Sequence, residues 1–331
     1  MFLSNKDKSM SNALFKKSRK TDSTINNYFD RVYLINLKKR PDRLIKVLHR
    51  LRDLNIRVQV LDAINGKSDP YFSEYMKYRQ APLTSEEIKI GRKLISSPGA
   101  WGYLLTWKTI LEDTIKNNYN RILSFDDDVI FIKNFNTRFN EWIEQIPCDW
   151  KILQLGATHK SHIKKEIHKN YFHPVLTNGS FATCLDNSIY KQLLDETIRM
   201  NSPFDSGPLR EMYKKYTNKC FVAYPHLVIA DVTDSDIRES RDLTKFAETK
   251  EWDLSLYDMD IQLDLISIVL VVRNKEKNIL QILKSLIEQK YSKIEVIIVN
   301  DCSSDKTPLL IKNFIIIDCH YNYLDYTHSL L

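Results

Sequence analysis

Three consecutive aspartates, Asp126, Asp127 and Asp128, are the residues of this sequence best placed to do chemistry. They follow an apolar run that predicts a strand, and side chains alternate along extended backbone, so Asp126 and Asp128 should point to the same side. Adjacent carboxylates repel one another unless a cation lies between them. Carboxylate oxygens are the ligands that Mg²⁺ and Mn²⁺ prefer. The triplet therefore predicts a divalent metal site formed by Asp126 and Asp128.

The elements around the triplet indicate an α/β fold. Apolar runs predict strands at 31–37, 58–61, 121–125, 129–131 and 150–155, and helices at 41–54, 85–91, 99–117 and 187–196. Strands that alternate with helices favour a mainly parallel, doubly wound sheet. Ligands of such sheets bind at the carboxyl ends of the strands, which is where the triplet lies. Residues 67–97 look polar and irregular, apart from the short helix.

Two other interpretations of the triplet stay open. It could be an acidic turn or a helix N-cap, although its apolar flanks make solvent alone a poor partner. Phosphatases of the haloacid dehalogenase type also place Asp-x-Asp after an apolar strand, with one aspartate as the nucleophile. They need a later acidic motif, which Asp231–Asp236 resembles only in part because it lacks the glycine.

Composition excludes several classes of protein. Of the formal net charge of +7, +4 lies in residues 1–28, which hold six Lys/Arg and two Asp, so we expect a basic, disordered arm and no nucleic-acid partner. The seven glycines form neither G-x-G-x-x-G nor a P-loop. The five cysteines are scattered, and no apolar run approaches the ~20 residues of a membrane span. We therefore expect a cytoplasmic protein without a transmembrane segment, for which peripheral membrane contact stays open.

A series of motifs between residues 30 and 240 shares its order and spacing with one enzyme family. They are Val32–Leu44, Leu61–Gly66, Pro98–Gly102, the Asp triplet, Trp150–Gly156, Pro203–Asp205, Tyr224–Val228 and Ser235–Ile237. This part of the chain resembles glycosyltransferase family 25, which includes lipooligosaccharide and procollagen galactosyltransferases. The resemblance implies a GT-A-type fold and an inverting, Mn²⁺- or Mg²⁺-dependent transfer of galactose or glucose. The donor would be a UDP-hexose and the acceptor a glycan or glycoprotein.

The resemblance also assigns roles near the first strand and the triplet. Asn36, Arg40 and Arg43 would hold the nucleotide, and two arginines there also suit a diphosphate. Asp62 and Gly66 would line the uridine pocket. Asp126 and Asp127 would contact the sugar nucleotide, with Asp126 and Asp128 on the metal.

An inverting transferase needs a general base for the acceptor hydroxyl, and Asp205 is the candidate; a turn or N-cap aspartate is an equal alternative. In one respect the chain departs from the family, which usually carries Ser-His where this sequence has Thr106-Trp107. That departure leaves a second hypothesis open, a degenerate transferase retained as a nucleotide-sugar- or glycan-binding module.

The C-terminal part resembles a different family. Strands at 265–272 and 294–299 and a helix at 275–289 form one βαβ element, similar to the start of glycosyltransferase family 2. That family reads D-D-G-S where this chain has Asn300–Ser303, so we expect a truncated, inactive segment. The predicted organisation is an arm (1–28), a family-25-like GT-A domain (29–247), a linker (248–264) and the family-2-like segment (265–331).

Overall fold

The computed structural model describes residues 23–159, 170–233, 241–259, 266–287, 294–315 and 321–326. The chain forms two compact units, residues 1–259 and 260–331. None of the helices in the described ranges is long and apolar enough to cross a membrane. The basic arm up to residue 22 and the Ser235–Ile237 motif lie outside the described residues.

The first unit is built on a seven-stranded sheet of order β2-β1-β3-β9-β5-β10-β7. Five strands run parallel to one another, and β9 and β7 run the other way. The strands are β1 (Arg31–Asn36), β2 (Gln59–Asp62), β3 (Arg121–Asp126), β5 (Ile152–Gln154), β7 (Tyr171–Phe172), β9 (Ala182–Asp186) and β10 (Cys220–Ala223). The predicted α/β fold with a mainly parallel sheet, the GT-A-type arrangement, is confirmed.

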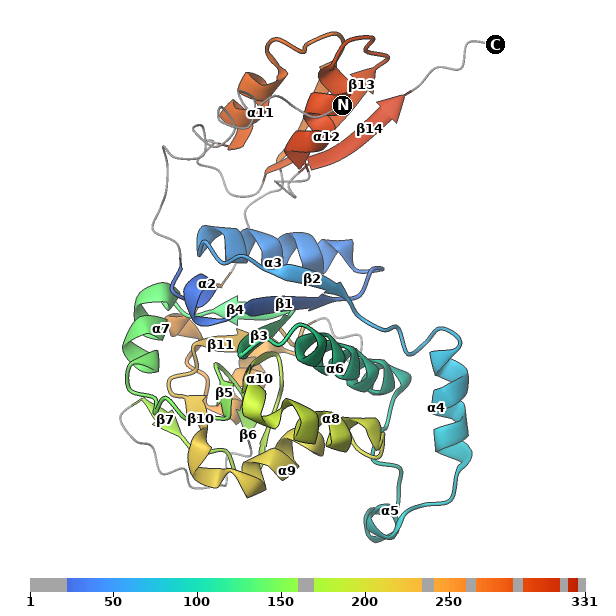
Figure 1. Cartoon of the computed structure of the whole chain (residues 1–331), viewed down its shortest axis with the longest axis vertical. Helices are drawn as coiled ribbons and strands as arrows, with labels where there is room; N and C mark the ends of the chain where they lie inside the picture. Colours follow the sequence, from blue (N-terminus) through green and yellow to red (C-terminus); the bar gives the residue numbers. More distant parts are fainter. Residues whose placement is uncertain are drawn as a thin grey trace. The chain divides into compact units, whose positions relative to one another are not determined.

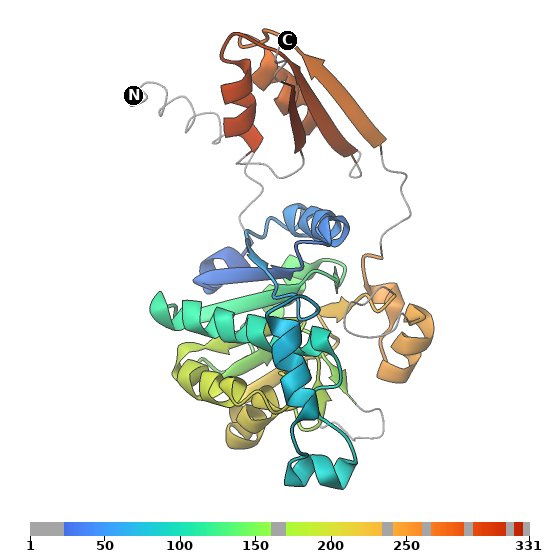
Figure 2. The same cartoon turned by 90° about the vertical axis from the view of Figure 1, so that its right-hand side faces the viewer.

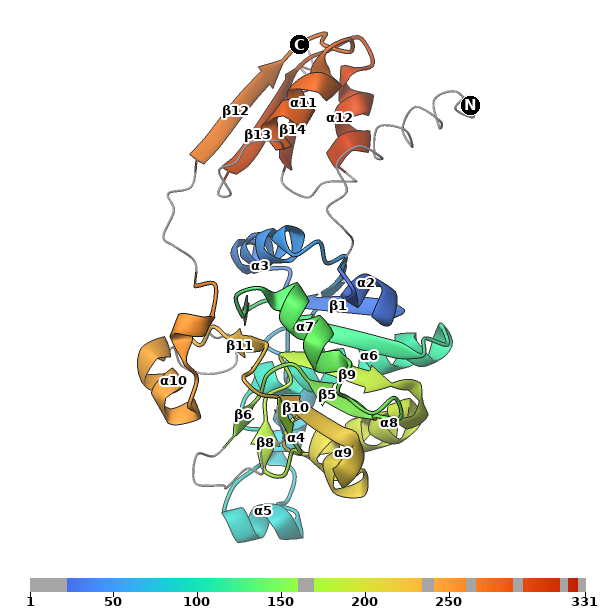
Figure 3. The ribbon, with the colours of Figure 1, turned by 90° about the vertical axis from the view of Figure 1, so that its left-hand side faces the viewer.

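Helices cover both faces of this sheet (Figures 1 and 3). One face packs against α3 (Pro41–Asp53), α7 (Phe135–Ile143), α10 (Leu243–Lys250) and the two-stranded sheet β4 (Val129–Phe131) and β11 (Val228–Ala230). The other face packs against α6 (Pro98–Lys116), α8 (Tyr190–Ile198) and α9 (Pro208–Lys215). Alternation along β1 explains the two cores, because Val32 and Leu34 enter the first and Tyr33 and Ile35 the second.

Helix α6 carries much of the second core and begins beside the acidic triplet. Its N-cap Ser97 accepts a hydrogen bond from the amide of Ala100, and Pro98 occupies the first turn, where its missing N–H costs nothing. Trp107, Ile110 and Leu111 are fully buried along this helix. The buried side chains of α6 therefore fix the position of its first turns beside the site.

Two segments differ from expectation. The stretch 67–97 contains α4 (Tyr71–Gln80) as well as the predicted α5 (Ser85–Ile90), because Tyr75 and Tyr78 pack on Trp101 of α6. Both helices extend away from the main sheet (Figures 1 and 2). Part of the expected linker belongs to the first unit: Trp252 and Tyr257 are buried in its core, and Tyr257 forms a bridge with Ile132.

The second unit is a small parallel sheet of order β12-β13-β14 with helices α11 and α12. Its elements are β12 (Ile266–Val272), α11 (Ile279–Ile287), β13 (Ile294–Asp301), α12 (Thr307–Ile315) and β14 (Tyr321–Tyr326). The predicted strand–helix–strand order is confirmed, and α12 and β14 extend it. Val272, Val296 and Ile298 pack against both helices.

Candidate active site

The acidic triplet lies at the carboxyl end of the central strands. β3 ends at Asp126, beside Ile35 of β1, and the chain turns through Asp127 and Asp128 into β4. β1 ends at Asn36, one residue farther along the same edge. The sequence therefore brings the triplet and the Asn36 amide together by strand register alone.

Asp127 is held by protein groups. Its Oδ2 accepts a hydrogen bond of 2.7 Å from the Asn36 amide, and its Oδ1 forms an ion pair of 2.8 Å with Arg43 of α3. Burial raises the pKa of Asp127, and the Arg43 charge and both hydrogen bonds oppose that rise. Asp127 thus fixes the turn and lines one cleft, whereas the aspartates on either side of it line two.

Asp126 and Asp128 line both clefts, and the Arg43 charge lowers the pKa of each without cancelling the effect of burial. Tyr103 of α6 donates to the Asp126 carboxylate, 3.1 Å from each oxygen, and its hydroxyl lies 2.9 Å from Ser180 Oγ. Burial, then repulsion from Asp128 and Asp127, raises the pKa of Asp126 well above its usual range. Burial likewise raises the pKa of Asp128 to about 7. Asp128 Oδ1 is buried and has no hydrogen-bond partner in the described structure.

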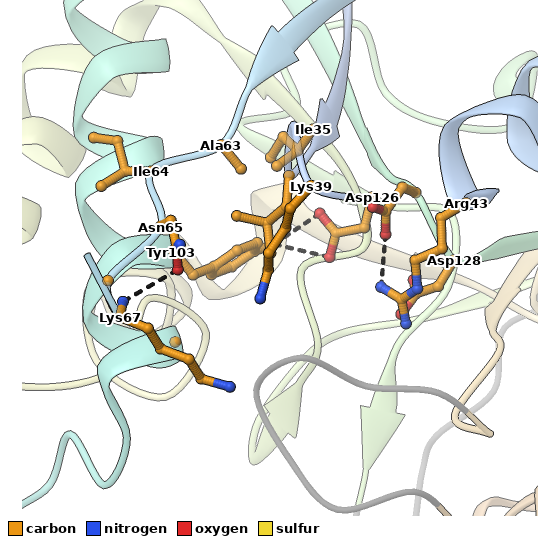
Figure 4. A pocket seen from close by; sticks show the side chains of 14 residues that line it. Ile35, Lys39, Arg43, Ala63, Ile64, Asn65, Lys67, Tyr103, Asp126 and Asp128 are labelled. Carbon is orange, nitrogen blue, oxygen red and sulfur yellow. Dashed lines mark hydrogen bonds and ion pairs between the residues drawn. The ribbon is translucent and has the colours of Figure 1, made fainter. Parts of the chain in front are cut away.

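A first cleft, of about 640 Å³, opens on one side of these carboxylates. Residues 63–67, which follow β2, form one wall, and Gly99 at the start of α6 also lines it. Lys39 and Lys67 line the space beside Tyr103 and Asp126, with Arg43 at its far end (Figure 4). The cleft therefore combines an acidic floor with basic side chains, a composition that suits a metal–diphosphate ligand.

A second cleft, of about 1090 Å³, meets the first at Tyr103, Asp126 and Asp128. Asp205, Asp231 and Arg241 contribute its other charged groups. Its remaining lining includes Ser96, Thr158, Ser180, Phe181, Phe204 and Phe246. Two ligands could thus approach the same pair of carboxylates from different sides.

The predicted nucleotide residues are not equally close to the first cleft. Arg43 and Gly66 line it, whereas Arg40 pairs with exposed Asp42 at 2.7 Å and is not among the lining residues. Asp62 is exposed at the end of β2, just before the wall that begins at Ala63. The nucleotide roles assigned to all of these residues stay predictions, and Asn36, Arg40 and Asp62 are not among the residues that line the cleft.

Gly66 has a packing reason to be glycine. A Cβ there would lie 1.8 Å from the carbonyl oxygen of Pro98, and a Cβ on Gly102 would lie 2.3 Å from that of Ile64. Thr106 completes this contact, since its hydroxyl accepts from the amide of Ile64 at 2.9 Å and donates to the carbonyl of Gly102 at 2.8 Å. The cleft wall thus rests directly on the backbone of α6.

Asp205 lies in the second cleft with Asp126 and Asp128. Its Oδ2 accepts a hydrogen bond of 2.9 Å from the amide of Gly179, which orients the carboxylate. The neighbouring Phe204 stacks on Trp107, with ring centroids 4.2 Å apart. The Thr106-Trp107 pair therefore supports both clefts, through the wall on one side and the Asp205 segment on the other.

Sequence reasoning did not single out Lys39, Lys67 and Tyr103, which line the first cleft. Each directly adjoins a residue that it did single out, namely Arg40, Gly66 and Gly102. The signal was present in the motifs, but which neighbour faces the cleft depends on the turn after β1 and the rotation of α6, which spacing does not specify.

Each of the two parts of the chain matches a family model. The family model described as "Glycosyltransferase family 25 (LPS biosynthesis protein)" matches residues 29–202, more than half of the chain. The model described as "Glycosyl transferase family 2" matches residues 267–327. Both resemblances inferred from the motifs are confirmed.

Individual relatives are more distant. "Inactive glycosyltransferase 25 family member 3" of Homo sapiens is 30% identical over 133 residues, 39% of this chain and 22% of that protein. "Procollagen galactosyltransferase 2" of Homo sapiens is 26% identical over 149 residues, 39% of this chain and 21% of that protein. The chain spans about a third or less of the length of the curated relatives it matches. A solved glycosyltransferase "involved in the glycosylation of the major capsid of PBCV-1" is 10% identical, with a TM-score of 0.33, over 62% of this chain and 93% of that one.

Proposed function

Because the chain belongs to glycosyltransferase family 25, we propose that its first unit transfers a hexose, galactose or glucose, from a UDP-sugar to a hydroxyl group of a glycan or glycoprotein. The observation that carries this proposal is the meeting of two clefts at Asp126 and Asp128. A transferase must bring a donor and an acceptor to one point, and two clefts that share a pair of carboxylates allow this.

The first cleft suits the donor. The ammonium groups of Lys39 and Lys67 would contact the diphosphate, together with the partial positive charge at the start of α6. Asn65 accepts a hydrogen bond from the amide of Lys67 at 3.2 Å and donates to Ser68 at 2.7 Å, which braces the wall beside the nucleotide.

The donor set on Asp126 and Asp128 fits Mg²⁺ or Mn²⁺. The described residues contain no cluster of three or more His, Cys, Asp or Glu placed to bind a metal. An ion held by two carboxylates would therefore take its other ligands from diphosphate oxygens and water, the usual arrangement for Mg²⁺. The buried, unpartnered Asp128 Oδ1 supports this assignment. When bound, the ion would neutralise the charge that develops on the UDP leaving group.

The second cleft suits the acceptor. Asp205 would accept the proton of the acceptor hydroxyl as its oxygen attacks the anomeric carbon from the face opposite UDP, which inverts the configuration. The bond from Gly179 to one carboxylate oxygen holds the other available for that proton.

Metal-dependent UDP binding tests the donor site. Titration calorimetry of the full chain with UDP and Mn²⁺ should show binding that EDTA abolishes. Lys67→Ala should weaken it about tenfold, because it removes a charge-assisted contact. Lys77→Ala, an equal loss of charge on exposed α4, serves as the matched control and should not. Equal effects of the two variants would show that only general charge matters and would refute the cleft assignment.

A second candidate is a nucleotide-sugar-binding protein without catalysis. It is favoured by one specific observation, that a relative carries the word "inactive" in its name. This candidate predicts UDP-sugar binding with no UDP release in the presence of any acceptor. Family membership leaves the phosphatase alternative without support.

A further inference from the structure

Helix α5 has an inverted pattern of burial. Its charged Glu87 is only 1% exposed, whereas Ile88 and Ile90 are 64% and 48% exposed. A helix that packs only on its own protein buries isoleucine and exposes glutamate. The pattern marks α5 as a candidate interaction surface.

A polar network holds α5 in this orientation. The carboxylate of Glu87 accepts hydrogen bonds from Tyr78 Oη at 2.7 Å, Lys93 Nζ at 3.1 Å and the amides of Thr84 and Leu94 at 3.0 and 3.1 Å. Thr84 caps the helix in return, forming a capping box. The hydrogen bonds of the buried Glu87 carboxylate thus all come from groups of the same segment. They fix the orientation of α5, and this orientation leaves the isoleucines exposed.

The same surface character continues on α4. We call residues 71–95, which contain α4 and α5, the α4–α5 lobe. Its inner tyrosines pack on Trp101, and Phe72 and Met76, four residues apart on α4, are exposed. With Leu83, Ile88 and Ile90 they make five of the eleven exposed large hydrophobic side chains described in the first unit. Such a concentration within one short segment marks an interaction surface.

The exposed charges of the lobe are mainly basic, which favours an anionic partner. Lys77, Arg79, Lys89 and Arg92 are exposed, against only two exposed acidic side chains, Glu74 and Glu86. Lys93 is neutralised by Glu87. Exposed aliphatic and aromatic groups interspersed with Lys and Arg match the composition of segments that lie on anionic lipid surfaces.

We propose that the α4–α5 lobe docks the protein onto an anionic membrane surface through its exposed apolar side chains. The lobe continues directly into Ser96 at the second cleft and into α6. Docking would therefore hold the acceptor side of the site near the plane of the membrane.

Vesicle sedimentation of the full chain tests the docking. The probes are vesicles of phosphatidylcholine containing phosphatidylglycerol, and vesicles of phosphatidylcholine alone. Wild type should bind the anionic vesicles. The double variant Ile88→Ser/Ile90→Ser should bind them at least about tenfold more weakly. Ile90→Ser alone should weaken binding, whereas Ile198→Ser, at a 50% exposed isoleucine on α8, should not. Unchanged tryptophan emission and far-UV circular dichroism would show that the variants keep the wild-type fold.

Three outcomes would overturn the proposal. Wild type could fail to bind anionic vesicles. It could bind them as tightly after Ile88→Ser/Ile90→Ser, which would place the membrane contact elsewhere, as in the basic residues before Tyr28. Or the double variant could abolish a concentration-dependent dimer in sedimentation velocity without affecting vesicle binding, which would make a second copy of the chain the partner.

Discussion

Replacing Arg43 with methionine should destabilise the first unit mainly through Asp127, the carboxylate with which Arg43 forms an ion pair. Arg43 and Asp127 form an ion pair of 2.8 Å with side chains only 13% and 9% exposed. Methionine fills a similar volume but carries no charge, so Asp127 would keep its hydrogen bond from Asn36 and the weaker attraction of the Arg40 charge. Breaking one side of a buried pair costs about 3–5 kcal/mol; the remaining hydrogen bond reduces this to about 2–3 kcal/mol here.

The five tryptophans make this loss easy to follow. All of them lie between Trp101 and Trp252, so their fluorescence reports on the first unit alone. A loss of about 2–3 kcal/mol should lower the midpoint of thermal unfolding by about 5–10 °C for a unit of this size. Arg52→Met, which breaks an exposed pair with Asp53 at 3.7 Å on the same helix, is the control and should change stability by less than about 0.5 kcal/mol.

The ionic origin of the effect has two further signatures. Burial raises the pKa of Asp127 while Arg43 lowers it, so removing Arg43 should raise that pKa further. A carboxyl group with a raised pKa destabilises the fold when ionised, and this penalty fades as the pH falls. The deficit of Arg43→Met should therefore be smaller at about pH 5 than at about pH 8. Asp127→Asn should recover much of it in the double variant.

A deficit that is independent of pH and that Asp127→Asn leaves unchanged would refute this reasoning. It would mean that Arg43 stabilises the unit through packing of its aliphatic stem and not through the pair.

Two further predictions concern the wall of the first cleft and the α4–α5 lobe. Gly102→Ala places a Cβ 2.3 Å from the Ile64 carbonyl oxygen, so it should lower the free energy of unfolding by about 1–3 kcal/mol and weaken UDP binding. Urea unfolding measures the first effect and calorimetry the second. Full stability with full binding would show that the wall does not rest on α6. The second concerns pH: burial alone would raise the pKa of Glu87, but its hydrogen bonds hold it at about 2, below the usual 4.5. The stabilisation that ionised Glu87 gives the fold should be complete above about pH 4.5 and disappear as the pH falls toward 2. Glu87→Gln should remove this pH dependence from acid unfolding curves. An acid transition that Glu87→Gln leaves unchanged would contradict the prediction.

Regular elements with strong periodicity could be predicted from the sequence. The strand before the triplet, the Pro41 helix and the long helix after Pro98 appear within one or two residues of their predicted limits. Hydrophobic spacing and proline at the first helical turn are local signals, and they need no knowledge of the rest of the fold.

Features that depend on distant packing could not be predicted. The sequence of α4 has little hydrophobic periodicity, and the helix is stabilised because Tyr75 and Tyr78 pack on Trp101. The pairing of β9 between β3 and β5 in the opposite direction likewise arises from tertiary contacts. At the site, the triplet was located by its own residues, whereas the partners Tyr103 and Lys67 required the rotation of α6 and the course of the loop after β2.

Release of UDP from UDP-galactose and UDP-glucose with Mn²⁺ tests the central claim most directly, since it asks whether the two carboxylates at the junction of the clefts support transfer chemistry. The account predicts turnover of one donor that EDTA abolishes and that Asp128→Asn, which removes a charge but little volume, reduces by at least about a hundredfold. Turnover that survives both EDTA and Asp128→Asn would contradict the assignment of the metal site. If UDP-sugars bind in a metal-dependent way but no acceptor supports turnover, the assignment of an enzyme would be contradicted.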